Sequence, residues 1–114
     1  MALEPRHIRE LAAELAAPTA KERELAAEKV ASWLTASLEP TFAAALARIL
    51  EIAISLEDDE TALEAQLNAV CEFSELGLAP RDVIERVIGD KEWNFAWASD
   101  YIDQLRDDLP VAPR

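Results

Sequence analysis

The sequence predicts an all-α protein of about six helices, paired into three antiparallel hairpins. Ala, Leu, Glu and Arg, which are strong helix formers, dominate the chain. The 2 glycines and nearly all of the 6 prolines stand where helices should begin or end, and no segment alternates apolar and polar residues as a half-buried strand does. The hairpins follow at a period near the ~40–47 residues of helical-hairpin repeats, which favours a right-handed solenoid; a compact helical bundle is the alternative.

The first two helices are bounded by proline and threonine. The first is expected to run from Pro5 to before Pro18, because its apolar residues recur at steps of three and four and form one stripe. Thr19 is expected to cap the second helix, with Glu22 three positions later completing a capping box. The expected buried face of the second helix comprises Ala26, Val30, Trp33, Leu34 and Ser37.

The third helix is apolar on nearly every side. It follows Pro40 and spans Phe42 to Leu56, with Arg48 and Glu51 as its strongly polar residues. Such a helix must be covered nearly all round, so we expect it at the centre of the core with Arg48 and Glu51 facing solvent. Its expected core residues are Leu46, Ile49, Leu50, Ala53 and Ile54.

Aspartate and glycine bound the fourth helix. Asp58 or Asp59 is expected to cap its N-terminus, where an acidic side chain also complements the helix dipole. Gly77 is expected to end it in the left-handed conformation, with Leu78 folding back onto the helix.

Two further helices complete the single domain, residues 1–114. The fifth is expected from Pro80 to Ile88, with a turn at Gly89 and Asp90. The sixth is expected to follow that turn and to run to about Leu109, where Pro110 stops it. Residues 110–114 are expected to form a frayed tail.

The charge balance limits the kinds of partner. The chain has 23 acidic and 11 basic residues, a formal net charge of -12. Such a surface repels phosphate backbones and anionic lipids, so nucleic acid and membrane surfaces are not expected partners. A basic protein is the expected partner. The alternative is that the acidity only keeps the protein soluble.

The residues of catalytic and metal sites are scarce. A single cysteine, Cys71, excludes an internal disulfide and suits a reducing, cytoplasmic compartment, and no apolar leader follows Met1. Cys71 falls on a predicted core stripe, whereas His7 lies in the first turn of a terminal helix. One His and one Cys do not make a zinc site, and no glycine-rich phosphate loop is present. We therefore expect no enzyme activity, no cofactor and no metal.

The strongest binding signal is aromatic and acidic. Trp93 and Trp97 lie four residues apart in the predicted sixth helix, away from the core face that carries Phe95, and Tyr101 continues their row. Aromatic anchors flanked by carboxylates suit an interface with a basic protein; alternatively, the tryptophans pack against the fifth helix. The candidate partner-binding residues are Glu57, Asp58, Asp59, Glu60, Glu72, Glu75, Trp93, Trp97, Asp100, Tyr101, Asp103 and Asp107.

About half of the chain resembles a known kind of helical repeat. The residues that carry the resemblance are Leu56, Glu57, Asp58, Asp59, Glu64, Ala65, Leu67, Asn68, Ala69, Val70, Glu72, Phe73, Glu75, Gly77, Leu78, Pro80, Asp82, Val83 and Ile84. This segment resembles HEAT-type repeats, and in particular the small HEAT-like immunity proteins of bacterial polymorphic toxin systems. Most of these residues are packing positions, so the resemblance does not assign interface residues.

The resemblance implies a role. Immunity proteins of this kind bind a cognate toxin domain and block its active site, and acidic ones commonly face nuclease toxins. The sequence is thus interpreted as an acidic inhibitor of a basic, nuclease-type toxin. The alternatives are a cytosolic scaffold or regulatory adaptor and a helical bundle that binds a small ligand.

Overall fold

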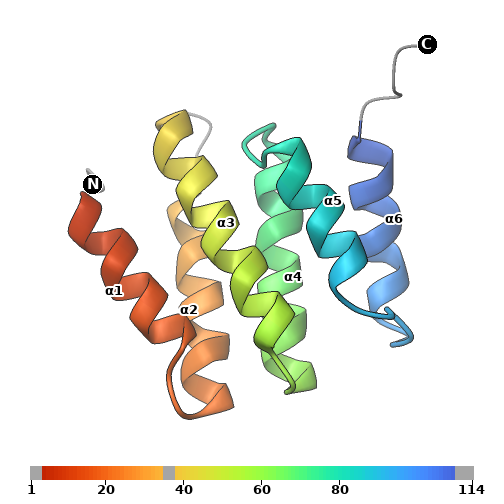
Figure 1. Ribbon diagram of the computed structural model, residues 1–114, viewed down its shortest axis with the longest axis horizontal. Coiled ribbons are helices and arrows are strands. Elements are labelled where there is room, and N and C mark those ends of the chain that lie inside the picture. Colours follow the sequence, from red (N-terminus) through yellow and green to blue (C-terminus); the bar gives the residue numbers. More distant parts are fainter. Residues whose placement is uncertain (1–3, 35–37, 110–114) are drawn as a thin grey trace.

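Six α-helices and no strand make up the part of the chain that the computed structural model describes, residues 4–34 and 38–109 (Figure 1). The helices are α1 (Pro5–Leu15), α2 (Ala20–Trp33), α3 (Pro40–Leu56), α4 (Glu60–Glu75), α5 (Arg81–Asp90) and α6 (Ala98–Asp108). The all-α prediction is therefore confirmed. Ser37, Met1 and the predicted tail at 110–114 lie outside the described residues.

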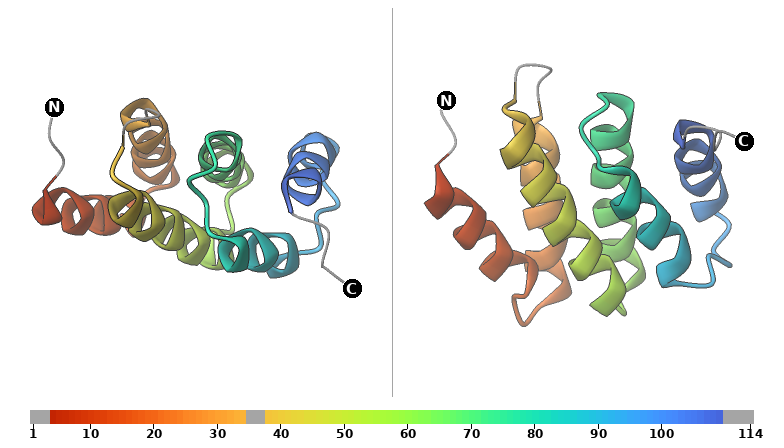
Figure 2. Two further views of the ribbon diagram at one scale, coloured as in Figure 1. Left: turned by 90° about the horizontal axis from the view of Figure 1, so that it is seen from above. Right: turned by 45° about the horizontal axis from the view of Figure 1, so that its top comes forward.

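The helices form two layers. Figure 2 shows α1, α3 and α5 in one row, which we call the odd layer, and α2, α4 and α6 in a second row, the even layer. Neighbours within each row pack on one another, and α4 also packs against α3 in the other row. α4 buries nine of its 16 residues and α3 six of its 17. The centre of the core is thus α4, and the prediction that α3 occupies it is wrong.

The predicted helix ends are largely confirmed, but the turn predicted at Gly89 and Asp90 is wrong because α5 continues through both residues. Thr19 and Asp59 each accept a hydrogen bond from the backbone N–H three residues later, at 3.2 and 2.9 Å. Gly77 has a φ of 70°, and the Leu78 N–H donates to the Phe73 carbonyl oxygen at 2.9 Å. Because a left-handed residue reverses the chain with little strain only where it is glycine, Gly77 ends α4 and directs Leu78 back onto the core.

One face of α3 is open to solvent, contrary to the prediction. Three of its five expected core residues are buried, and these are Leu46, Leu50 and Ile54. Ile49 and Ala53 are only partly buried, and Ile52 and Leu56 are 56% and 78% exposed. The reason is the layered arrangement. α3 has α1 and α5 beside it and α4 behind it, and no helix among the described residues covers its outer side.

The sixth helix begins later than the sequence predicts. α6 starts at Ala98, and residues 91–97 form an irregular connection from α5. The Trp93 indole N–H lies 3.1 Å from two carbonyl oxygens of the last turn of α5 and satisfies groups that a helix end leaves free. Trp93 and Phe95 therefore do not lie on α6, and the predicted helical row of Trp93, Trp97 and Tyr101 is wrong.

The two polar residues of α3 have different surroundings. Arg48 is exposed, as predicted, and pairs with Asp82 of α5 at 2.7 Å. Glu51 is only 8% exposed, so the prediction that it faces solvent is wrong. α5 packs over this side of α3 and brings the Asp90 carboxylate close to Glu51. Burial first, and Asp90 second, raise the pKa of Glu51 to about 7.

This raised pKa predicts a pH-dependent stability. Between about pH 4.5 and 7 the folded protein binds a proton at Glu51 that the unfolded chain has released, so stability should fall as pH rises. Glu51→Gln keeps a hydrogen-bond donor toward Asp90 without the charge. Between pH 5 and 8 we expect the free energy of unfolding of this variant to fall by about 1–3 kcal/mol less than that of the natural chain. Urea denaturation at several pH values measures this, and parallel pH profiles for the two proteins would contradict it.

Candidate functional site

Negative charge is concentrated in one layer. The helices of the odd layer carry 5 basic and 6 acidic residues, and those of the even layer carry 4 basic and 11 acidic residues. Their formal charges are thus -1 and -7. The negative electrostatic potential is therefore strongest along α2, α4 and α6.

The even layer brings acidic and aromatic side chains together across its three helices. We call this surface the acidic–aromatic face; its residues are Glu24, Glu28, Glu60, Glu64, Trp97 and Tyr101. Glu24 and Glu28 are four residues apart on α2, and Glu60 and Glu64 are four apart on α4, so each pair lies on one side of its helix. Packing of α4 on α6 places Glu60 and Glu64 beside the aromatic residues, and packing of α2 on α4 places Glu24 and Glu28 near Glu64.

Hydrogen bonds and a shallow hollow connect these residues. The Trp97 indole N–H donates to Glu60 Oε1 at 2.7 Å, and the Tyr101 hydroxyl donates to Glu64 Oε2 at 3.3 Å. Glu64 also lines a hollow of about 280 Å³ between α2 and α4, together with Glu24 and Glu28. Glu64 therefore lies between the hollow and Tyr101, and Glu60 lies one turn away from it beside Trp97.

The aromatic residues of the face are held in place by their neighbours. The ring of Trp97 stacks on Phe95 with centroids 5.2 Å apart and meets Tyr101 edge-on at 6.3 Å. Burial and the nearby Glu64 carboxylate raise the pKa of the Tyr101 phenol, so it remains a hydrogen-bond donor at neutral pH. Trp97 and Tyr101 are only partly buried, which leaves part of each ring free to contact a partner.

The acidic–aromatic face has little internal neutralisation. Within the described ranges, Lys21 is the one cation at ion-pair distance from any of the four carboxylates of this face, and it lies 3.5 Å from Glu24. Lys29, on the same helix, pairs instead with Glu14 of α1 at 2.7 Å. The face therefore keeps a net negative charge that a basic side chain can neutralise.

The other predicted binding residues are distributed over several places. Glu57 is buried, and Asp59 caps α4, whereas Asp58 next to them is exposed. Glu72 and Glu75 lie on the C-terminal half of α4. The three predicted aspartates of α6, Asp100, Asp103 and Asp107, are all exposed. Of the twelve predicted residues, Glu60, Trp97 and Tyr101 belong to the acidic–aromatic face.

Sequence reasoning missed Glu24, Glu28 and Glu64. They come together only through the packing of α2 on α4, which no local pattern reveals. The available signal was the spacing of four residues within two pairs of glutamates, Glu24 with Glu28 and Glu60 with Glu64. That spacing predicts two acidic helix sides but not that the sides face one another.

The residues most often used in catalysis lie in structural positions. Cys71 is buried, and its Sγ lies 3.6 Å from the Tyr101 carbonyl oxygen. Burial, with Glu75 and other acids, raises the pKa of the Cys71 thiol to about 12, which keeps it in the unreactive form. His7 accepts a hydrogen bond from the Glu4 N–H at 2.8 Å and thereby caps α1. Over residues 4–34 and 38–109, no three His, Cys, Asp or Glu side chains are grouped as metal ligands would be.

Comparisons with protein-family models, with curated proteins and with solved structures give no match to this chain. None of the helices in the described part of the chain has the length and apolar character that crossing a membrane requires.

Proposed function

We propose that this protein is an acidic inhibitor that binds a basic partner protein, and that the partner is a toxin of the nuclease type. In this proposal the chain is a cytoplasmic bacterial immunity protein, and its three hairpins form a right-handed HEAT-like solenoid. The observation that carries it is the acidic–aromatic face, where four carboxylates and two aromatic rings lie together across α2, α4 and α6. The two-layer order of the helices supports the repeat architecture.

The mechanism is occlusion of the partner's active site. A nuclease binds its substrate through Lys and Arg side chains that contact phosphates. The carboxylates of the acidic–aromatic face take the place of those phosphates, and Trp97 and Tyr101 supply apolar contact area. Inhibition then requires no chemistry and no cofactor from this chain.

The alternative is a scaffold or regulatory adaptor that binds an ordinary cytosolic protein. The two functions differ in the partner and in what happens to it. The purified protein should retain a basic protein from an extract of its native host, and it should abolish nuclease activity of that protein at a one-to-one ratio. Capture of a non-basic partner, or of a nuclease whose activity is unchanged, supports the adaptor.

Association with the partner should depend strongly on salt. Because charge steers the encounter, the association rate constant should fall at least about tenfold between low and physiological ionic strength, while dissociation changes less. Stopped-flow mixing of the two proteins at several salt concentrations measures both rates. Glu28→Lys with Glu64→Lys should reduce the salt dependence. A salt-independent association rate would contradict phosphate mimicry.

Trp97 should contribute to binding more than to folding. Trp97→Ala removes the stacked ring and the hydrogen bond to Glu60, and we expect affinity for the partner to fall by about 2 kcal/mol or more. Folding stability should fall less than for Leu50→Ala. Reversing Asp103 and Asp107 to Lys should mainly lower the association rate. Calorimetric titration and thermal melts on the same variants distinguish a binding role from a purely structural one, in which only the melting temperature falls.

A further inference from the structure

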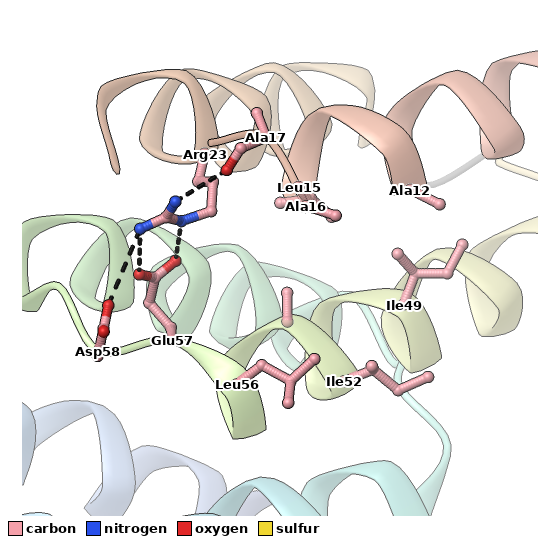
Figure 3. A pocket seen from close by; sticks show the side chains of 11 residues that line it. Ala12, Leu15, Ala16, Ala17, Arg23, Ile49, Ile52, Leu56, Glu57 and Asp58 are labelled. Carbon is pink, nitrogen blue, oxygen red and sulfur yellow. Dashed lines mark hydrogen bonds and ion pairs between the residues drawn. The ribbon is translucent and has the colours of Figure 1, made fainter. Parts of the chain in front are cut away.

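A groove of about 420 Å³ lies between α1 and α3, apart from the acidic–aromatic face (Figure 3). One wall is the end of α1, where Ala12 and Ala16 are one turn apart. The opposite wall is the C-terminal half of α3, with Ile49, Ile52 and Leu56. From Ile49 to Leu56 this wall extends about 10 Å, or two helical turns.

The lining of the groove is unusually exposed for an apolar surface. Ile52 and Leu56 are among the four most exposed large apolar residues of the described ranges, and both lie on the same wall. The opposite wall carries three alanines beside Leu15, and their small side chains leave room for a third helix to approach. The groove thus has an apolar lining along two helical turns, as a site for the apolar side of an amphipathic helix requires.

The polar end of the groove selects the charge of its occupant. Arg23 donates from Nε and Nη2 to the two oxygens of Glu57, at 2.8 and 3.0 Å, and from Nη1 to the Ala17 carbonyl oxygen at 2.8 Å. These bonds leave Arg23 little capacity for an anion. The Asp58 side chain lies beside this pair and is 96% exposed, and its Oδ1 is 4.0 Å from Arg23 Nη2. The three side chains carry a net charge of one negative unit.

We propose that this groove binds an amphipathic helix of a partner protein, with leucine-like side chains between α1 and α3 and a lysine or arginine at Asp58. Charge complementarity identifies the occupant, since the exposed Asp58 carboxylate and the net negative charge of the polar end of the groove favour a basic segment over an acidic one. The proposal rests on the proposed function in that the partner is a basic protein, but it assigns a second contact surface on a different side of the molecule.

The test uses the intact protein and synthetic helical peptides of about 15 residues. The first peptide carries leucines three and four residues apart with lysines between them. The second replaces each lysine by glutamate, and the third replaces each leucine by serine. Amide chemical shifts in ¹⁵N-labelled protein report where each peptide binds. We expect the first peptide alone to shift the amides of Ala12, Ala16, Ile49, Ile52 and Leu56.

Two variants give the matched comparison. Ile52→Asp places a charge in the groove at an exposed position, where it should not unfold the protein, and should weaken the first peptide at least about tenfold. Leu76→Asp makes the same kind of change at a half-exposed leucine outside the groove and should leave the affinity unchanged. Asp58→Asn should weaken the lysine peptide about twofold or more and should not weaken any binding of the glutamate peptide.

Each other outcome overturns the proposal. Equal binding of the serine peptide, or shifts confined to the acidic–aromatic face, would mean that the protein merely attracts cations. If the glutamate peptide bound as tightly as the lysine peptide, Asp58 would not select a basic occupant. A dimer in analytical ultracentrifugation that Ile52→Asp dissociates would make a second copy of this chain the occupant. None of these results bears on nuclease inhibition, so failure here is distinguishable from failure of the proposed function.

Discussion

Leu50→Ala should lower the free energy of unfolding by about 2–5 kcal/mol, the cost of a buried large-to-small change that leaves a cavity. Leu50 is fully buried on α3, in the cluster that joins both layers. The structure gives this position a larger effect than its neighbour Ile49, which is only partly buried in the groove wall. Denaturant unfolding followed by circular dichroism measures the loss.

Ile52→Ala is the matched control, because it removes apolar carbons from the same helix at an exposed site. We expect it to change stability by no more than about 0.5 kcal/mol, as surface substitutions generally do. Equal losses at Leu50 and Ile52 would mean that the outer face of α3 is covered, and would also contradict the open groove between α1 and α3.

Glu57→Ala should cost about 3 kcal/mol or more, since removing one partner of a buried ion pair leaves the other uncompensated. The Glu57 side chain is only 1% exposed, and it accepts hydrogen bonds from Arg23, from the Asp59 N–H at 3.1 Å and from Gln66 Nε2 at 2.9 Å. It thereby ties α2, the turn before α4 and α4 itself together. Urea denaturation at neutral pH tests this.

Asp58→Ala is the control for Glu57→Ala, because it removes a neighbouring exposed carboxylate and should leave stability unchanged within error. Lowering the pH distinguishes the two variants further. Burial alone would raise the pKa of Glu57, but the bonds from Arg23 and its other donors outweigh burial and hold the pKa below 4.5. The stabilisation is therefore complete above pH 4.5 and is lost as pH falls through the folded-state pKa. A constant difference between the variants down to pH 2 would contradict it.

Local signals in the sequence predict the helices well. Thr19, Asp59 and Gly77 mark helix ends through short-range geometry, since a cap bonds within its own turn and a left-handed residue favours glycine wherever it occurs. The predicted start of α6 is wrong because the Trp93 indole N–H bonds back to carbonyl oxygens of α5. This contact depends on how the chain reverses between the two helices.

Tertiary packing decides what the sequence does not. Glu51 lies in α3 and Glu57 directly follows it, yet their surroundings differ. The ion pair with Arg23 of α2 lowers the pKa of Glu57, whereas burial under α5 beside Asp90 raises the pKa of Glu51. Composition predicts both as solvent-facing charges. The candidate site follows the same rule, since the partners of Trp97 and Tyr101 on α4 are known only once α4 and α6 are placed side by side.

The uneven charge of the two layers makes the molecule an electric dipole directed across its shortest dimension, 17 Å. The field of a positively charged body exerts a torque on such a dipole before any atoms touch, and this torque turns α2, α4 and α6 toward the charges. The torque thereby shortens the time that the protein needs to reach the binding orientation, in addition to the time that it needs to approach the charged body. On any cationic surface, an anion-exchange resin included, the protein should settle with the even layer inward and with α1, α3 and α5 facing the solution.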